Sequence, residues 1–277
     1  MERIDTESLT AAPAWLAGAR RALATHWPEY LMEAAGLGLF MVSACMFVAL
    51  FEYAGSPARH WIEDAFVRRL PIGVAMGLTA VALIYSPWGK RSGAHLNPAV
   101  TFTFWRLGKI ASWDAALYVG AQFAGGTLGV LLSASVLTPQ VIAHASVNYA
   151  VTQPGAQGVA VAFAAEAAIS FGLMLAVLIV SNRPSLNRYT GLFAGALVAT
   201  YIGIEAPLSG MSMNPARSFA SAFPAQIWPG LWLYFVAPPS GMLLAAEAYL
   251  RARRPVFCCK LHHDNDQRCI FHCGYPH

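Results

Sequence analysis

Charged residues are scarce in this chain. Asp, Glu, Lys and Arg together make up 12% of its 277 residues, whereas 57% of the residues are hydrophobic. A soluble domain carries about 25% charged residues, which it needs to cover its surface. The shortage of charge therefore excludes an ordinary soluble fold and predicts a chain whose outer surface faces lipid.

Three other features are missing. Residues 1–29 contain charged side chains and no early apolar core, so we expect no cleavable signal peptide, and the first membrane segment must direct the chain to the membrane. Only Cys45, one of five cysteines, precedes residue 258, which argues against a disulfide framework for the fold. No nucleophile–base pattern or phosphate-binding loop stands out, so we expect no enzymatic activity.

Six long apolar segments dominate the sequence. They cover residues 30–51, 70–85, 113–137, 159–180, 189–204 and 228–250. Most of them reach or approach the roughly 20 residues that a helix needs to cross the hydrocarbon layer. Residues 86–111 and 205–227 differ, since each region holds a Gly/Pro-rich loop followed by a helix-compatible stretch too short to span. The sequence predicts an all-α membrane protein.

The basic residues are unevenly distributed among the connecting segments. If both termini lie in the cytoplasm, all but four of the 18 Lys and Arg residues fall on that side; the four are Arg59, Arg68, Arg69 and Arg217. Cytoplasmic loops carry an excess of Lys and Arg, so the pattern predicts this orientation in a cell (inner) membrane. The same pattern accounts for the net charge of +4, and we expect no nucleic-acid partner.

The chain repeats itself. Ser-Gly-Ala-His-Leu-Asn-Pro-Ala-Val at 92–100 returns as Ser-Gly-Met-Ser-Met-Asn-Pro-Ala-Arg at 209–217, and Glu-Ala-Ala at 33–35 returns at 166–168. Each half has three apolar segments, an odd number, so the two halves must lie in opposite orientations. Inverted repeats with broken helices at corresponding positions place a solute site near the middle of the bilayer.

The two Asn-Pro-Ala motifs are typical of helix starts, because Asn is a strong N-cap and Pro is well tolerated at the first helical position. We expect Asn97 and Asn214 each to cap a half-helix, and opposite insertion brings the two N-termini together. Each N-terminus carries about half a positive charge. A water oxygen held by both asparagine amides would interrupt proton conduction, and cations would be repelled.

The paired motifs in matching halves resemble the major intrinsic protein (aquaporin) family over about residues 28–250. The resemblance implies an aquaporin-like fold of six transmembrane helices and two re-entrant half-helices, a pore in each subunit and a homotetramer. It implies a passive channel for water or small uncharged solutes that excludes ions and protons. A proton-coupled secondary transporter and a non-conducting scaffold protein remain alternatives. The expected regions are a cytoplasmic segment (1–29), a channel domain (30–250, with repeats at about 30–137 and 159–250) and a cytoplasmic tail (251–277).

Three charged side chains fall at positions where the membrane makes charge costly. Glu33 and Glu166 occupy matching positions in the two halves. They could carry protons in a transporter, but their symmetry favours a role as acceptors for otherwise unpaired loop N–H groups, as the resemblance also implies. Arg217 directly follows the second Asn-Pro-Ala motif, and the resemblance places it in the narrowest constriction, where it donates to solutes and repels cations.

The remaining pore residues are assigned by resemblance. Met76, Ile202 and Met211 match constriction positions in the second span, the fifth span and the second loop. Strict water channels have an aromatic residue and a histidine at the first two of these positions, so this chain departs from them toward a more apolar filter. His95 resembles a histidine of the cytoplasmic vestibule, which could contact solute or be packed and hydrogen-bonded.

The tail concentrates soft metal ligands. Four of the five cysteines and four of the eight histidines lie in residues 258–277. Thiolate and imidazole ligands suit zinc or copper, although transport requires no cofactor. The candidate ligands are Cys258, Cys259, His262, His263, Cys269, His272 and Cys273. The alternative is a flexible or membrane-surface tail anchored by its basic residues.

Overall fold

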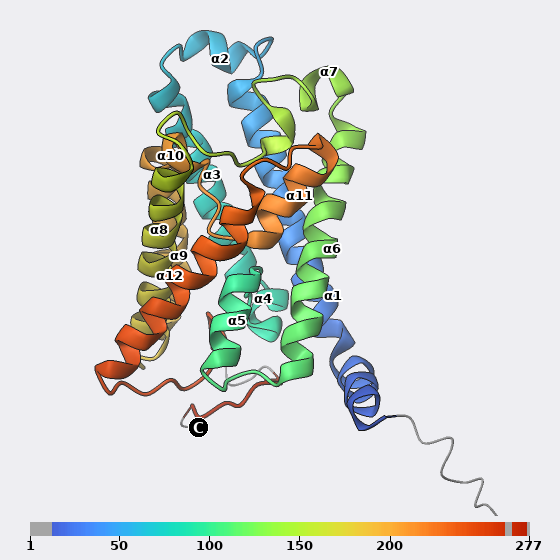
Figure 1. Ribbon diagram of the computed structural model, residues 1–277, viewed down its shortest axis with the longest axis vertical. Helices are drawn as coiled ribbons and strands as arrows, with labels where there is room; N and C mark the ends of the chain where they lie inside the picture. The colour runs from blue at the N-terminus through green and yellow to red at the C-terminus, as the bar shows by residue number, and fades with distance from the viewer. Residues whose placement is uncertain (1–12, 264–267, 276–277) are drawn as a thin grey trace, which may run out of the picture.

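The computed structural model of the protein describes residues 13–263 and 268–275, and all helices and turns of this part form one α-helical bundle (Figure 1). The long helices are α1 (Ala14–Glu52), α3 (Ala65–Tyr85), α6 (Ser112–Val136), α8 (Val159–Ser181), α9 (Thr190–Ile204) and α12 (Leu231–Arg251). The short helices are α2 (Pro57–Trp61), α4 (Pro87–Ser92), α5 (Pro98–Arg106), α7 (Pro139–Ile142), α10 (Ala206–Ser209) and α11 (Pro215–Ala225). The predicted all-α architecture is confirmed.

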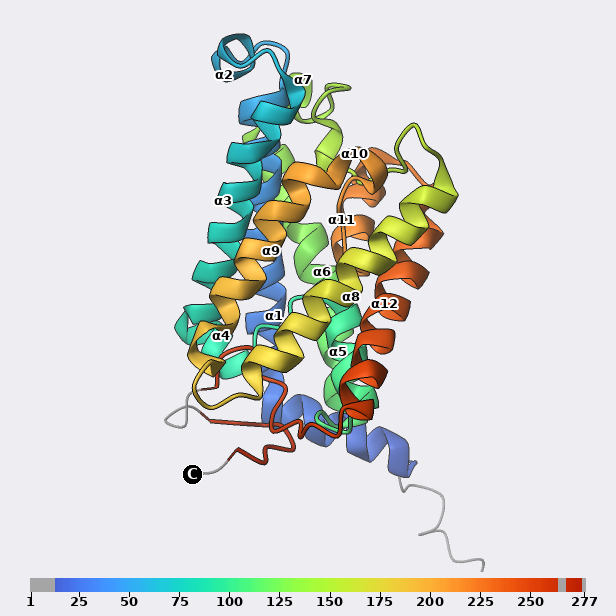
Figure 2. The ribbon, with the colours of Figure 1, turned by 90° about the vertical axis from the view of Figure 1, so that its left-hand side faces the viewer.

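Among the described residues, four helices are long and apolar enough to cross a membrane by themselves, namely α1, α3, α6 and α8. α12 has 21 residues, as many as α3, and lies beside α8 in the same bundle (Figure 2). α9 has only 15 residues. It is preceded directly by the 3₁₀ turn η3 (Asn187–Tyr189) and followed after one residue by α10, so residues 187–209 are almost continuously helical.

The first long helix differs most from its predicted bounds. α1 begins at Ala14 rather than near residue 30, and it has 39 residues. Its early part contains Arg20 and Arg21, which break the apolar pattern. Pro28 lies inside the helix, and a proline removes a backbone hydrogen bond and kinks a helix. In Figure 1 the first turns of α1 (darkest blue) accordingly run at an angle to the rest of the helix.

The two halves of the chain pack in the same way. α1 lies against α6 in the first half and α8 lies against α12 in the second, while α3 and α9 pair one helix from each half (Figure 2). Glycine permits the close approach of α3 and α9. A Cβ atom on Gly73 would stand 2.5 Å from the carbonyl oxygen of Ala199, and one on Gly77 would stand 2.5 Å from that of Gly195. Small residues at such crossings are typical of membrane bundles.

α5 and α11 are half-helices of 9 and 11 residues. They lie within the two regions, 86–111 and 205–227, that were predicted to hold helices too short to span. In Figure 1 they lie one above the other in the middle of the bundle, and they contact each other. The bundle therefore contains two broken helices whose preceding loops meet at its centre, as opposite orientation of the halves requires.

Candidate functional site

Asn97 and Asn214 cap the two half-helices. The side-chain oxygen of Asn97 accepts a hydrogen bond from the N–H of Ala99 at 2.8 Å. That of Asn214 accepts from the N–H groups of Ala216 at 3.0 Å and Arg217 at 3.2 Å. A proline follows each asparagine at the first helical position. An N–H group at that position has no acceptor within the helix, so its absence in proline costs no helical hydrogen bond. The local sequence alone is enough to start a helix at both sites.

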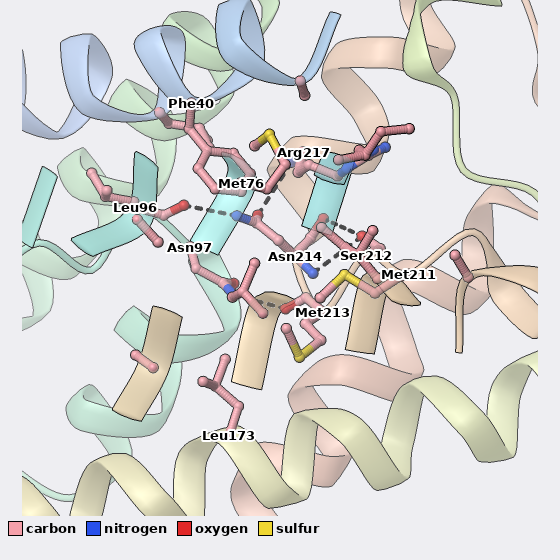
Figure 3. A pocket seen from close by; sticks show the side chains of 18 of the residues that line it. Phe40, Met76, Leu96, Asn97, Leu173, Met211, Ser212, Met213, Asn214 and Arg217 are labelled. Carbon is pink, nitrogen blue, oxygen red and sulfur yellow. Dashed lines mark hydrogen bonds between the residues drawn. The ribbon is translucent and has the colours of Figure 1, made fainter. Parts of the chain in front are cut away.

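The same two asparagines tie the repeats together. The amide nitrogen of Asn97 donates to the carbonyl oxygen of Met213 at 2.7 Å, and that of Asn214 donates to the carbonyl oxygen of Leu96 at 2.7 Å (Figure 3). An amide NH2 group carries two donors. Each asparagine therefore has one N–H beyond this bond, and both residues line the central cavity.

The loops that precede the half-helices share an unusual backbone. Ala94 and Leu96 in the first loop have φ angles of 53° and 49°, and Met211 and Met213 in the second have 52° and 54°. The left-handed conformation costs a residue other than glycine about 1–2 kcal/mol. The matching positions show that both loops adopt the same backbone conformation. Because this conformation costs free energy, other groups must hold the loops in place.

Two buried carboxylates hold these loops. Glu33 and Glu166 are both fully buried, and each accepts two backbone N–H groups from consecutive loop residues. The donors are His95 (3.1 Å) and Leu96 (2.6 Å) for Glu33, and Ser212 (2.6 Å) and Met213 (2.7 Å) for Glu166. The serine hydroxyl that ends the preceding short helix, Ser92 in α4 or Ser209 in α10, also donates to each carboxylate. Hydrogen bonds of this charge-assisted kind offset the burial of the carboxylate.

A cavity of about 420 Å³ runs along the two loops. All seven residues that were predicted for the pore line it: Asn97, Asn214, Arg217, Met76, Ile202, Met211 and His95. These residues come from α3, α9, both loops and α11, and Figure 3 shows several of them around the paired asparagines. The fold thus brings together residues that lie far apart in the chain.

The cavity wall also contains residues that the sequence did not indicate. Phe40 from α1 and Leu173 from α8 both line it (Figure 3). Phe40, Ala44 and Val48 are all wall residues and follow the spacing of one helical face. That spacing could have marked a common face, but α1 is apolar all round here, so the pattern could not show which face turns inward.

Arg217 brings a fixed positive charge to the cavity wall. Its guanidinium Nη1 donates to the carbonyl oxygen of Ala150 at 2.8 Å. Ala150 ends the turn η2 (Asn148–Ala150), whose three residues have φ angles of 41° to 53°. An arginine keeps its proton in proteins, so any solute in this part of the cavity meets a cation that is held in place by a strained loop.

His95 is packed and hydrogen-bonded, and its partners come partly from the tail. The ring is 3% exposed, with Nδ1 at 3.1 Å from Oγ1 of Thr101 and Nε2 at 3.0 Å from the carbonyl oxygen of Cys259. A carbonyl can only accept, so Nε2 carries the proton and donates it. Phe271 stacks on the ring with its centroid at 5.7 Å. The tail therefore lies at this end of the cavity, which we call the tail end.

Four of the seven candidate metal ligands in the tail come together. Cys258, His263, Cys269 and Cys273 each place a ligand atom within 4.8 Å of the others. A Cys/His cluster in the tail is thereby confirmed. The Cys258 thiol, which is a neighbour in space, raises the pKa of Cys269 together with burial, to about 12. The Cys269 thiol is therefore protonated when no metal is bound.

The other three candidate ligands, Cys259, His262 and His272, lie outside this cluster. Their side chains have partners elsewhere, which are the carbonyl oxygen of Lys109 for Cys259 (3.6 Å), the ring of Tyr85 for His262, and the carbonyl oxygen of Gly108 for His272 (2.8 Å). Of each neighbouring pair, 258–259 and 262–263, one member belongs to the cluster and the other has a hydrogen-bond or ring partner outside it.

Comparison with known proteins gives consistent matches. The profile of the major intrinsic protein family matches residues 22–249. The probable aquaporin NIP7-1 of Arabidopsis thaliana is 31% identical over 204 residues, 73% of this chain and 72% of that protein. A probable NIP-type aquaporin of Nicotiana alata is 33% identical over 228 residues, 80% of this chain and 76% of that protein.

A solved structure shows the same fold. The X-ray structure of the aquaglyceroporin from Plasmodium falciparum superposes with a TM-score of 0.65 at 21% identity, covering 81% of this chain and 96% of that one. Nothing in these comparisons supports a proton-coupled transporter. The chain belongs to the major intrinsic protein (aquaporin) family, and it is a multi-pass membrane protein that acts as a passive channel for water and small solutes, not as an enzyme.

Proposed function

We propose that this pore passes at least one uncharged solute larger than water and that it excludes ions and protons. The observation that carries the proposal is the filter, in which Met76, Ile202 and Met211 line the same cavity as Arg217. Three apolar side chains can contact the carbon skeleton of a solute, while one guanidinium donates to its oxygen atoms. A histidine in place of Ile202 would add a polar group that favours water.

The filter is tested by Ile202→His in proteoliposomes with stopped-flow light scattering. We expect wild-type protein to conduct water and at least one of glycerol, urea and hydrogen peroxide, and Ile202→His to lower the permeability of the larger solute several-fold relative to water. Ile204→His is the matched control, because Ile204 lies on the same helix and is 61% exposed. Wild-type vesicles that pass only water would overturn the apolar-filter proposal.

Exclusion of charge rests on the centre of the pore. The two half-helix N-termini meet there, each with about half a positive charge, and the second N–H of Asn97 and of Asn214 can donate to the oxygen of one passing water. A water that accepts from both amides cannot accept a proton from its neighbour, so the proton-conducting chain is interrupted. Arg217 adds a second positive barrier.

Asn214→Asp tests this barrier. A carboxylate at the N-terminus of α11 would offset the positive end of the helix dipole, so we expect a cation leak that the wild type lacks, measured as a current or as sodium flux into vesicles. Gln157→Glu adds the same charge at an exposed loop position. This control variant should show no more cation current or sodium flux than the wild type. Sodium or proton conductance in the wild type would contradict the proposal.

The remaining assignments are also proposals. We place both termini in the cytoplasm of a cell (inner) membrane because of the basic residues, and the start of α1 and the tail lie at the same end of the bundle (Figure 1). A homotetramer is proposed from family membership, and native mass spectrometry in detergent tests it. The Cys/His cluster of the tail is proposed to bind a soft metal ion, zinc or copper.

A further inference from the structure

The tail cluster has dimensions close to those of a metal centre. Sγ of Cys258 lies 3.7 Å from Sγ of Cys269, and Nε2 of His263 lies 3.1 Å from Sγ of Cys273. With zinc–sulfur bonds of about 2.3 Å, two sulfurs of a tetrahedral site stand about 3.8 Å apart. The first pair already has this spacing. The widest separation in the cluster, at most 4.8 Å, needs to shrink by only about 1 Å.

The donor set is typical of structural zinc. Three thiolates and one imidazole complete a tetrahedral shell with no open position, which is the arrangement of zinc sites that stabilise a fold. A residue that is bonded to the bundle orients this imidazole. The His263 ring stacks on the ring of Tyr275, with 4.5 Å between the ring centroids. The hydroxyl of Tyr275 donates to the carbonyl oxygen of Ser181 at 2.8 Å, at the end of α8.

The tail is attached to both halves of the channel. On the first half, the N–H of Leu261 donates to the carbonyl oxygen of Gly93 at 3.0 Å, and the N–H of His272 donates to that of Lys109 at 3.0 Å. On the second half, the N–H of Phe257 donates to the side-chain oxygen of Asn182 at 2.6 Å. The tail thus crosses from one repeat to the other beneath the bundle (Figure 1).

Between these attachments the tail reaches the cavity. Leu261 lines the cavity and is 6% exposed, and Phe271 stacks on His95. Lys260 is buried as well, and its ammonium group donates to the carbonyl oxygen of Arg268 at 2.8 Å. Leu261 therefore lines the tail end of the cavity, Phe271 stacks on another wall residue, and the buried cation of Lys260 is next to Leu261 in the chain.

We propose that Cys258, His263, Cys269 and Cys273 bind one Zn²⁺ and that the zinc-bound tail closes the tail end of the pore. This gate rests on the proposed function, because closure has meaning only for a conducting channel. The described tail residues after α12 form no helix or strand, so a bound metal supplies much of the free energy that folds them. Removal of zinc should release Leu261 from the cavity wall and Phe271 from His95, and so open the pore.

The first measurement is the zinc content of full-length protein purified without a polyhistidine tag and loaded with zinc alone. We expect about one zinc per chain for the wild type, as one closed Cys3His shell requires, and loss of zinc in Cys269→Ser and Cys273→Ser. Cys259→Ser is the matched control. It removes a buried tail thiol next to a ligand, but that thiol faces the carbonyl oxygen of Lys109, so zinc should be retained.

The second measurement needs no variant, so it holds even if a ligand substitution impairs folding. Hydrogen exchange at the amides of Leu261 and His272, whose bonds attach the tail to the first half, should be slow with zinc and fast after chelation. Water and glycerol permeability of vesicles should rise several-fold when zinc is stripped before reconstitution and fall when zinc is restored. Cys269→Ser should conduct at the higher rate with or without zinc.

The outcomes separate the site, the gate and the channel. Equal zinc in the wild type and in Cys269→Ser overturns the site. Stoichiometric zinc with unchanged exchange and unchanged permeability overturns the gate. If zinc slows exchange in the tail while no vesicle conducts water or solute in either state, the zinc-held closed tail is supported and the proposed function fails instead.

Discussion

Among single residues, Glu33 and Glu166 are the most constrained. Each carboxylate is buried and accepts at least three hydrogen bonds from one loop. The loops contain four left-handed residues that are not glycine, which cost free energy wherever they occur. The glutamates therefore serve the pore indirectly, by holding the backbone that positions Asn97 and Asn214.

Glu33→Gln and Glu166→Gln test this role. Glutamine keeps the shape but has only one acceptor oxygen, and its NH2 group faces loop N–H groups that also donate. We expect each substitution to lower the free energy of unfolding by about 1–3 kcal/mol, seen as a lower Tm in detergent. Glu247→Gln is the control, because its ion pair with Arg106 lies at the surface and contributes little. Equal Tm values for all three variants would contradict the role.

Among the helices, the pair α1 and α6 depends on glycine. A Cβ atom on Gly125 would stand 2.0 Å from the carbonyl oxygen of Ala34, and one on Gly129 would stand 2.3 Å from that of Gly38. Backbone atoms cannot move aside as a flexible side chain can. The two helices therefore approach as closely as their backbones allow, which places the half-helix α11 beside α6.

A pair of substitutions on α6 separates packing from helix propensity. Gly125→Ala should force the helices apart and destabilise the protein by about 1–3 kcal/mol or more, measured as a lower Tm and a loss of monodisperse protein. Gly120→Ala, on the same helix, meets nothing within 4 Å. Because alanine favours a helix by about 1 kcal/mol over glycine, this control should be neutral or stabilising, and a loss as large as that of Gly125→Ala would refute the packing argument.

For the whole molecule, the uneven basic residues predict the orientation in the membrane. The start of α1 and the described part of the tail lie at one end of the bundle (Figure 1), which supports the proposal that both termini are cytoplasmic. We expect green fluorescent protein fused after the last residue to fluoresce in a bacterial host, which it does only when it folds in the cytoplasm. Alkaline phosphatase fused at the same position should be inactive, and active phosphatase would reverse the assignment.

The membrane class, the inverted repeat and the two half-helix starts could be predicted from the amino-acid sequence alone. These properties are local or periodic: an apolar run is recognisable from its length, and Asn-Pro-Ala caps a helix through its own side chain. The start of α1 at Ala14 was not visible in this way. Polar residues such as Arg20 and Arg21 interrupt the apolar pattern there, although they are good helix formers.

The tertiary structure was needed to identify the cavity-wall residues that lie outside any motif. A helix that is apolar all round carries no mark of its inward face, so Phe40 and Leu173 could not be assigned to the cavity wall. The individual contacts of the tail could not be predicted either. Cys259 and His95 are 164 residues apart, and whether Cys258 or Cys259 joins the Cys/His cluster depends on how the tail packs against both repeats. Packing of that kind is a property of the assembled bundle, because each contact exists only after the others have formed.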